Sequence, residues 1–178
     1  MDGVVPFGGP DYFVFLGLLV FSRGMDFLST WIATPRLVLE GNPFVKFLGW
    51  KWGAALNSAV CIVLARWPVP AIVISTASVL VAARNFQLAW LMRSVGEEPY
   101  GLWHAARLRE TRAPLFLGCL FAQTFLTAAV GGAAIWFSPN AVTQAIGAGI
   151  VCYAGAVVVY TLLSFWRIRR TGGYFPQT

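Results

Sequence analysis

Charged side chains are scarce in this sequence. Only 11% of its 178 residues are Asp, Glu, Lys or Arg, whereas a soluble globular protein carries about 25%. Because so few polar groups cannot cover a surface that faces water, the composition excludes a soluble domain. No hydrophilic block is long enough to fold alone, so we expect a single integral membrane domain over residues 1–178.

Histidine and cysteine are also scarce, which excludes several chemistries. The only histidine, His104, lies between apolar runs, so no histidine inside a span can hold a haem or assist a serine nucleophile. Cys61, Cys119 and Cys152 stand singly, without the spacing of metal ligands. Asp26 is the only acidic residue inside a span, which argues against an aspartyl intramembrane protease. We therefore predict no metal site, no cofactor and no catalytic residue.

Long apolar runs are what the sequence does contain, and they are comparable in length to the roughly 20 residues of a membrane-crossing helix. Short turns join the second run to the third (67–70) and the fourth to the fifth (138–140). The polar stretch 93–114 is interpreted either as an amphipathic helix over 99–113 lying in the membrane interface or as a solvated loop. We predict an all-α helix bundle with spans over about 12–34, 52–67, 71–92, 115–137 and 141–166.

The basic residues predict how the chain is oriented. Five spans place the two ends on opposite sides, and an excess of Lys and Arg is typical of cytoplasmic segments. With the N-terminus outside and the C-terminus cytoplasmic, only Arg66 falls outside, and ten basic residues fall inside: Arg36, Lys46, Lys51, Arg93, Arg107, Arg109, Arg112, Arg167, Arg169 and Arg170. We expect a multi-pass protein of the bacterial inner (plasma) membrane.

The same distribution explains the net charge of +6. Orientation accounts for the basic excess, so no nucleic-acid partner is predicted. Membrane lipids are the expected partners, including bound lipid, because basic segments at a membrane surface attract anionic lipid. Other membrane subunits are expected as well.

Small residues recur four apart in the last two spans, and such faces let helix backbones approach closely. We expect these two spans to pack against each other as an antiparallel hairpin. The predicted contact residues are Thr124, Ala128 and Gly132 on one helix and Ala148, Cys152 and Ala156 on the other.

The first span carries an unusual group of polar residues. Arg23 and Asp26 are three residues apart, so they share a helix face and can pair. Ser29 and Thr30 extend this polar surface. Each ionisable group inside a span costs at least about 2.5 kcal/mol on insertion scales. These side chains therefore need partners within the protein.

Partners at the same depth are expected from the third span and from the inner loop. We expect Asp26 to pair with Arg23 or with Arg84, while Glu40 caps the cluster. The full predicted cluster comprises Arg23, Asp26, Ser29, Thr30, Glu40, Asn42, Lys51, Arg84, Asn85 and Gln87. It is interpreted either as an ion-pair network that fixes helix register or meets another subunit, or as a functional site such as an ion or proton relay, a headgroup pocket or a catalytic carboxylate.

Two short motifs carry a family resemblance. Asp26, Ser29 and Thr30 form an Asp-x-x-Ser-Thr element, and a Glu-x-Asn-Pro element follows at 40–43. Together with Lys51 and Asn85, these residues resemble a family of small bacterial polytopic membrane proteins of unknown function. The resemblance covers about residues 12–92, and the last two spans depart from it, as do Arg23 and Arg84. It implies a polar cluster and supplies no activity.

Small size, the lack of internal repeats and the lack of catalytic groups favour a non-catalytic integral subunit, a scaffold or an accessory component of a larger membrane complex. The alternative is a small transporter, channel or proton-relay protein that works through Arg23, Asp26 and Arg84. A third hypothesis is an enzyme that modifies lipids with Asp26 and Glu40.

Overall fold

Six helices make up the computed structural model, which describes residues 3–40 and 43–171 and contains no strand in those ranges. Five of the helices are long and apolar enough to cross a membrane. The predicted all-α bundle is therefore confirmed, and the chain is a multi-pass integral membrane protein. The helices are α1 (Pro10–Ala33), α2 (Pro43–Leu64), α3 (Pro68–Val95), α4 (Glu97–Glu110), α5 (Ala113–Phe137) and α6 (Ala141–Thr171).

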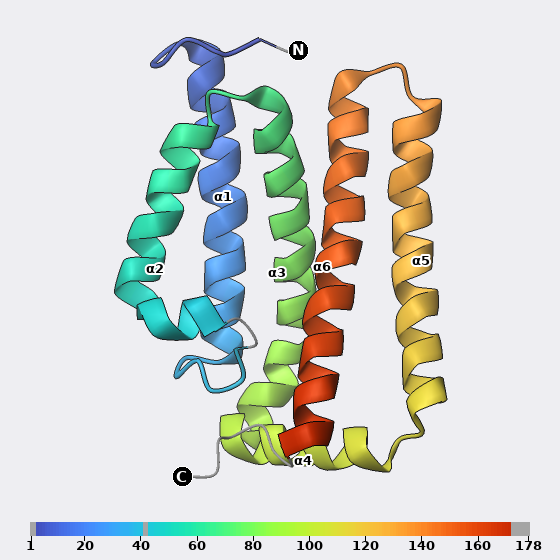
Figure 1. Ribbon diagram of the computed structural model, residues 1–178. Coiled ribbons are helices and arrows are strands. Elements are labelled where there is room, and N and C mark those ends of the chain that lie inside the picture. Colours follow the sequence, from blue (N-terminus) through green and yellow to red (C-terminus); the bar gives the residue numbers. More distant parts are fainter. Residues whose placement is uncertain (1–2, 41–42, 172–178) are drawn as a thin grey trace.

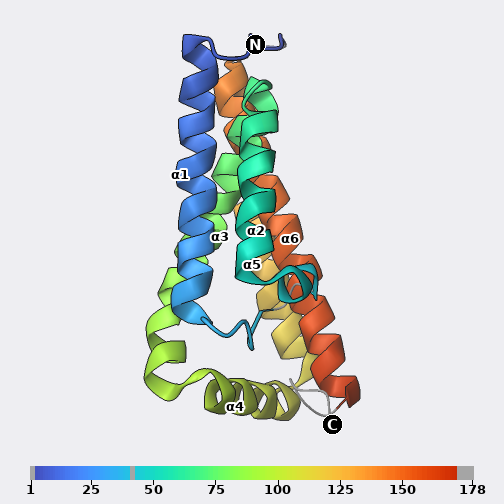
Figure 2. The same cartoon turned by 90° about the vertical axis from the view of Figure 1, so that its left-hand side faces the viewer.

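The five long helices stand side by side, and α4 crosses one end of the bundle (Figures 1 and 2). α1 and α6 both pack along α3, α2 lies beside α1, and α5 covers the far side of α6. α1 begins at the end away from α4, whereas α6 ends close to α4. The positive-inside pattern predicts that the α4 end is the cytoplasmic one, and this orientation stays a prediction.

The start of the second span, predicted at about residue 52, was wrong, because helical residues precede it. α2 begins at Pro43, a residue whose fixed φ suits the first turn of a helix. Gly49 interrupts the helix with a φ of 64°, a backbone conformation that glycine adopts without a steric penalty. Immediately after this kink, the indole Nε1 of Trp50 donates to the Pro35 carbonyl at 2.8 Å, and its ring meets Phe27 edge-on.

The polar stretch after α3 folds as helix α4 rather than as a solvated loop. Ala105 and Leu108 bury one face of α4 against Ile168 of α6. Arg169 donates to the carbonyls of Leu108 and Thr111 and so satisfies the C-terminal end of α4. His104 stacks on Tyr100 one turn earlier, and burial lowers the pKa of its imidazole below the usual value.

Glycines let α6 lie close to both of its neighbours. A Cβ on Gly147 would stand 2.5 Å from the Gly131 carbonyl oxygen of α5. A Cβ on Gly149 would stand 2.7 Å from the Val73 carbonyl oxygen of α3. Two residues correspond to a rotation of about 200° around a helix, so these glycines face opposite sides. Backbone contact on both sides makes α6 the link between α3 and α5.

The predicted small-residue contact between α5 and α6 is displaced by one residue. A Cβ on Gly132 would meet open space, whereas one on Gly131 would clash, and Cys152 is exposed. A one-residue change turns a helix by about 100°, so adjacent glycines cannot be told apart by spacing alone. Of the other predicted contact residues, Thr124 is buried, and Ala128, Ala148 and Ala156 are half-buried.

The two adjacent glycines give a matched test of this packing. Gly131→Ala and Gly132→Ala gain the same helix propensity, so their difference isolates the contact with α6. Because overpacking costs about 1–3 kcal/mol, we expect Gly131→Ala to be less stable than Gly132→Ala by about that amount. Equilibrium unfolding of both variants in detergent measures the difference. Equal stabilities would show that the Gly131–Gly147 contact is wrong.

Candidate functional site

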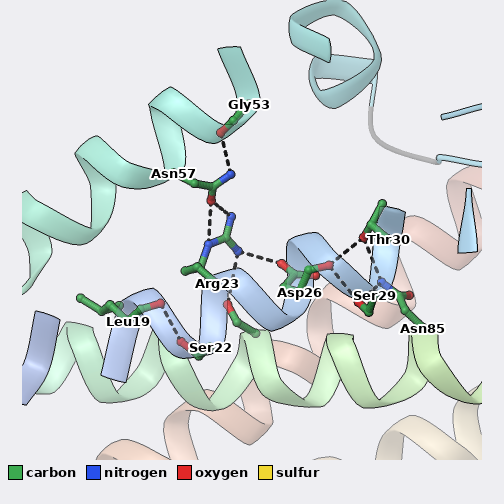
Figure 3. A network of polar contacts seen from close by, with 10 residues as sticks. Leu19, Ser22, Arg23, Asp26, Ser29, Thr30, Gly53, Asn57 and Asn85 are labelled. Carbon is green, nitrogen blue, oxygen red and sulfur yellow. Dashed lines mark hydrogen bonds and ion pairs between the residues drawn. The ribbon is translucent and has the colours of Figure 1, made fainter. Parts of the chain in front are cut away.

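Arg23 lies where α1 faces both α2 and α3, and its guanidinium bonds to all three helices (Figure 3). Its Nη1 donates to Asp26 Oδ2 on α1 at 2.9 Å and to Ser78 Oγ on α3 at 3.2 Å. Its Nε donates to Asn57 Oδ1 on α2 at 2.8 Å, and its Nη2 donates to the same oxygen. Asn57 in turn donates to the Gly53 carbonyl at 2.8 Å. One side chain thus joins three membrane-spanning helices.

A second set of bonds follows from Asp26 toward α3. The hydroxyls of Ser29 and Thr30 donate to the Asp26 backbone carbonyl at 2.8 and 3.0 Å. The Asn85 amide donates to both hydroxyl oxygens at 3.3 and 3.2 Å. These hydroxyls satisfy a helix carbonyl and accept from a neighbouring helix, so the predicted polar face of α1 is paired with α3 at two levels (Figure 3).

The cluster is enclosed but not sealed. The side chains of Arg23 and Asp26 are 29% and 20% exposed, whereas Ser22 and Ser29 are fully buried. Ser22 donates to the Leu19 carbonyl and takes no part in the network. Hydrogen bonds with a charged partner contribute about 1.5–3 kcal/mol in water-soluble proteins. Several of them together are comparable to the insertion cost of an arginine and an aspartate.

The predicted pairing of Asp26 is made by Arg23 and not by Arg84. Arg84 is half-buried on α3 and makes no hydrogen bond or ion pair with any residue that the structure describes. Gln87 and Lys51 are exposed. Glu40 is half-buried and interacts electrostatically with Asp26 and with Lys46. The structure therefore brings together Arg23, Asp26, Ser29, Thr30 and Asn85, with Glu40 nearby, whereas Asn42 lies outside the described residues.

Comparisons with family models, with curated proteins and with solved structures found no match. The resemblance of residues 12–92 to a family of small membrane proteins therefore stays a prediction.

Asn57 and Ser78 are the members of the network that sequence reasoning missed. Asn57 is a polar residue inside the apolar run of α2, and that isolation was the available signal. Ser78 resembles many small residues that simply bond their own helix. Neither assignment follows from spacing along one helix, because both depend on how α2 and α3 are aligned with α1.

A second polar cluster, also missed, fixes the loop after α1. Glu97 at the start of α4 is only 5% exposed. Its carboxylate accepts from the Thr34 hydroxyl at 2.6 Å and from the backbone N–H groups of Arg36 and Val38 at 3.2 and 3.3 Å. Thr34 Oγ1 also accepts from the Leu39 N–H at 3.2 Å. The loop thus wraps around a buried carboxylate and ties α4 to the end of α1.

Both clusters consist of hydrogen bonds and ion pairs that join separate elements of the bundle. In the described ranges, no three His, Cys, Asp or Glu side chains gather closely enough to hold a metal ion. Arg23 is the cationic partner of the Asp26 carboxylate, and the hydroxyls of Ser29 and Thr30 donate to a backbone carbonyl rather than to a side-chain base. The Asp26 carboxylate at this site can take part in ion pairing and in proton exchange.

The loop around Glu97 generates a testable prediction. In Glu97→Gln, an NH₂ group replaces one acceptor oxygen and faces backbone donors. Hydrogen bonds to charged groups contribute about 1.5–3 kcal/mol, and about 1.4 kcal/mol corresponds to tenfold. We therefore expect the amides of Arg36 and Val38 to exchange their hydrogens about tenfold faster or more, as measured by hydrogen exchange with mass spectrometry.

Glu110→Gln is the matched control, because Glu110 lies at the other end of α4, is 61% exposed and pairs with Arg107 of the same helix rather than with the loop. In this control variant, the amides of Arg36 and Val38 should exchange their hydrogens as fast as in the unmodified protein. Unchanged exchange in Glu97→Gln would contradict the role given to the Glu97 carboxylate.

Proposed function

We propose that this chain is a non-catalytic integral subunit, a scaffold or accessory component of a larger membrane protein complex. Its Arg23–Asp26 pair carries the proposal. Arg23 donates its hydrogen bonds to Asp26, Asn57 and Ser78, so this pair of charges joins the first three helices. Side chains used in this way are not available to act on a substrate.

The surface of the bundle supports the same proposal. The long helices expose large apolar side chains, such as Phe125, Trp136 and Leu163, which suit lipid or another membrane helix. The basic excess at one end of the bundle supports placement in a bacterial inner membrane with that end in the cytoplasm, where it would also contact anionic lipid. A small rigid bundle of this kind is suited to assembly with other subunits.

A proton or ion relay is the second candidate, and one observation favours it. The Asp26 side chain keeps 20% of its exposure, and Glu40 lies close enough to interact with it electrostatically. Carboxylates within or next to a span, here one inside α1 and one in the loop after it, are found in proton pathways of membrane proteins.

Purification from native membranes in a mild detergent distinguishes the two candidates. We expect the tagged chain to elute with the same partner subunits in fixed stoichiometry, well above the 19.4 kDa of one chain. An unrelated multi-pass protein with the same tag controls for adventitious capture. A homogeneous assembly of this chain alone that carries ions in liposomes would overturn the proposal.

Asp26→Asn separates the roles of the carboxylate. The asparagine oxygen can still accept from Arg23, but the guanidinium loses its counter-charge inside the span. For a structural pair we expect a loss of about 3–5 kcal/mol, the usual cost of breaking a buried ion pair, together with loss of the complex. Intact assembly with lost proton flux would instead support the relay. Ser58→Ala, at an exposed position on α2, is the control.

A further inference from the structure

Arg84 is an intramembrane charge for which the described part of the chain supplies no counter-charge. It is half-buried on α3 and makes no hydrogen bond or ion pair with any part of the chain that the structure describes. The next residue, Asn85, bonds to Ser29 and Thr30 of α1, which places Arg84 at the depth of those hydroxyls. An arginine near the middle of a span costs about 2.5–3.5 kcal/mol on insertion scales, so an anion is expected beside it.

The spans themselves offer no carboxylate for this purpose. α2, α3, α5 and α6 contain no Asp or Glu, and Asp11 lies at the far end of α1. Asp26 is already held by Arg23 at 2.9 Å. A second copy of the chain would present the same occupied Asp26. No carboxylate within the spans is therefore available to Arg84, and we expect the anion on a different molecule.

A lipid phosphate fits Arg84 less well than a carboxylate inside the membrane. α3 continues for eleven residues beyond Arg84, to Val95, which corresponds to about 16 Å of helix toward the nearer membrane surface. Side chains on a helix lean toward its N-terminus, and here that direction leads away from this surface. Reaching a headgroup would require the side chain to fold back against this preference.

A neighbouring side chain extends the polar surface. Gln87 lies three residues after Arg84, on the same side of α3, and is exposed. An amide facing lipid tails has no hydrogen-bond partner there, whereas a neighbouring membrane helix supplies one. We call Arg84 and Gln87 together the α3 polar ridge.

We infer that the α3 polar ridge is the contact surface for a membrane-spanning helix of a different subunit, which presents an Asp or Glu carboxylate to Arg84. This inference rests on the proposed function and adds to it the place and the chemistry of the contact. The Arg84 guanidinium pairs with the carboxylate, and the Gln87 amide bonds to the partner helix beside it. The pair is neutral within the membrane and specifies both depth and register.

Site-specific cross-linking in native membranes tests this contact. The photo-reactive residue p-benzoylphenylalanine is placed at Gln87 and, as a control, at Phe125, which is exposed on the outer face of α5. We expect the Gln87 position to capture a membrane-spanning peptide that contains an Asp or Glu within about one helical turn of the adduct. The control position should not capture that peptide. Adducts with lipid alone, with a peptide lacking an acid, or with this chain itself would overturn the inference.

A charge exchange then tests the pair. Arg84→Glu should lower co-purification of the captured partner at least tenfold, and replacing the partner's acid by Arg should restore it. Arg84→Lys should retain the partner, whereas Arg93→Gln, at an exposed position near the end of α3, should leave co-purification unchanged. Each variant is first compared with the unmodified chain by gel filtration. If Arg84→Glu does not fold, Arg84→Gln takes its place and should lose the partner that Arg84→Lys keeps.

The outcomes for the two proposals are distinct. A complex that persists in a folded Arg84→Glu or Arg84→Gln chain would overturn the α3 polar ridge as the contact, while the chain remained a subunit. An unmodified chain that purifies without any other subunit would overturn the proposed function and this inference together.

Discussion

The guanidinium of Arg23 is the group around which the first three helices are arranged. A cation with five N–H donors in a fixed fork cannot be left unsatisfied inside an apolar bundle. Its bonds to Asp26, Asn57 and Ser78 hold the relative positions of α1, α2 and α3 at one depth. Asn85 repeats the link between α3 and α1 two turns further on. Arg23, Asp26, Ser29 and Thr30 of the first span thereby belong to one connected system.

In the other half of the bundle, close backbone contacts join the helices. α6 touches α5 through Gly131 and Gly147 and touches α3 through Gly149, so backbones approach where side chains are absent. Such contacts depend on van der Waals packing, which is the main source of helix association among apolar surroundings. α4 then ties the two halves at one end, through Glu97 to the loop after α1 and through Arg169 of α6 to its own C-terminus. Hydrogen bonds and an ion pair thus join α1, α2 and α3, whereas close backbone packing joins α6 to α3 and α5.

Much of this arrangement could be read from the sequence, and the limits have physical reasons. Hydropathy located all five spans to within a few residues except at the start of α2, where helical turns precede Gly49. The Arg23–Asp26 pair followed from i, i+3 spacing, because both residues lie on one helix. Asn57 did not follow, because its contact depends on the alignment of two helices. Gly131 and Gly132 could not be distinguished, because a small-residue pattern does not define which of two neighbours faces the partner.

A double-mutant cycle between Arg23 and Asn57 tests the central claim most directly. Arg23→Met, Asn57→Leu and the double variant are unfolded in detergent, and any effect of leaving Asp26 without its counter-charge cancels in the cycle. Interhelical hydrogen bonds in membranes contribute about 0.6–2 kcal/mol, and this bond has a charged donor, so the account predicts a coupling of about 1–2 kcal/mol. The same cycle with Ser58→Ala, on the exposed side of α2, should show additive effects. Additive effects for Arg23 and Asn57 as well would contradict the claim that this arginine holds the helices together.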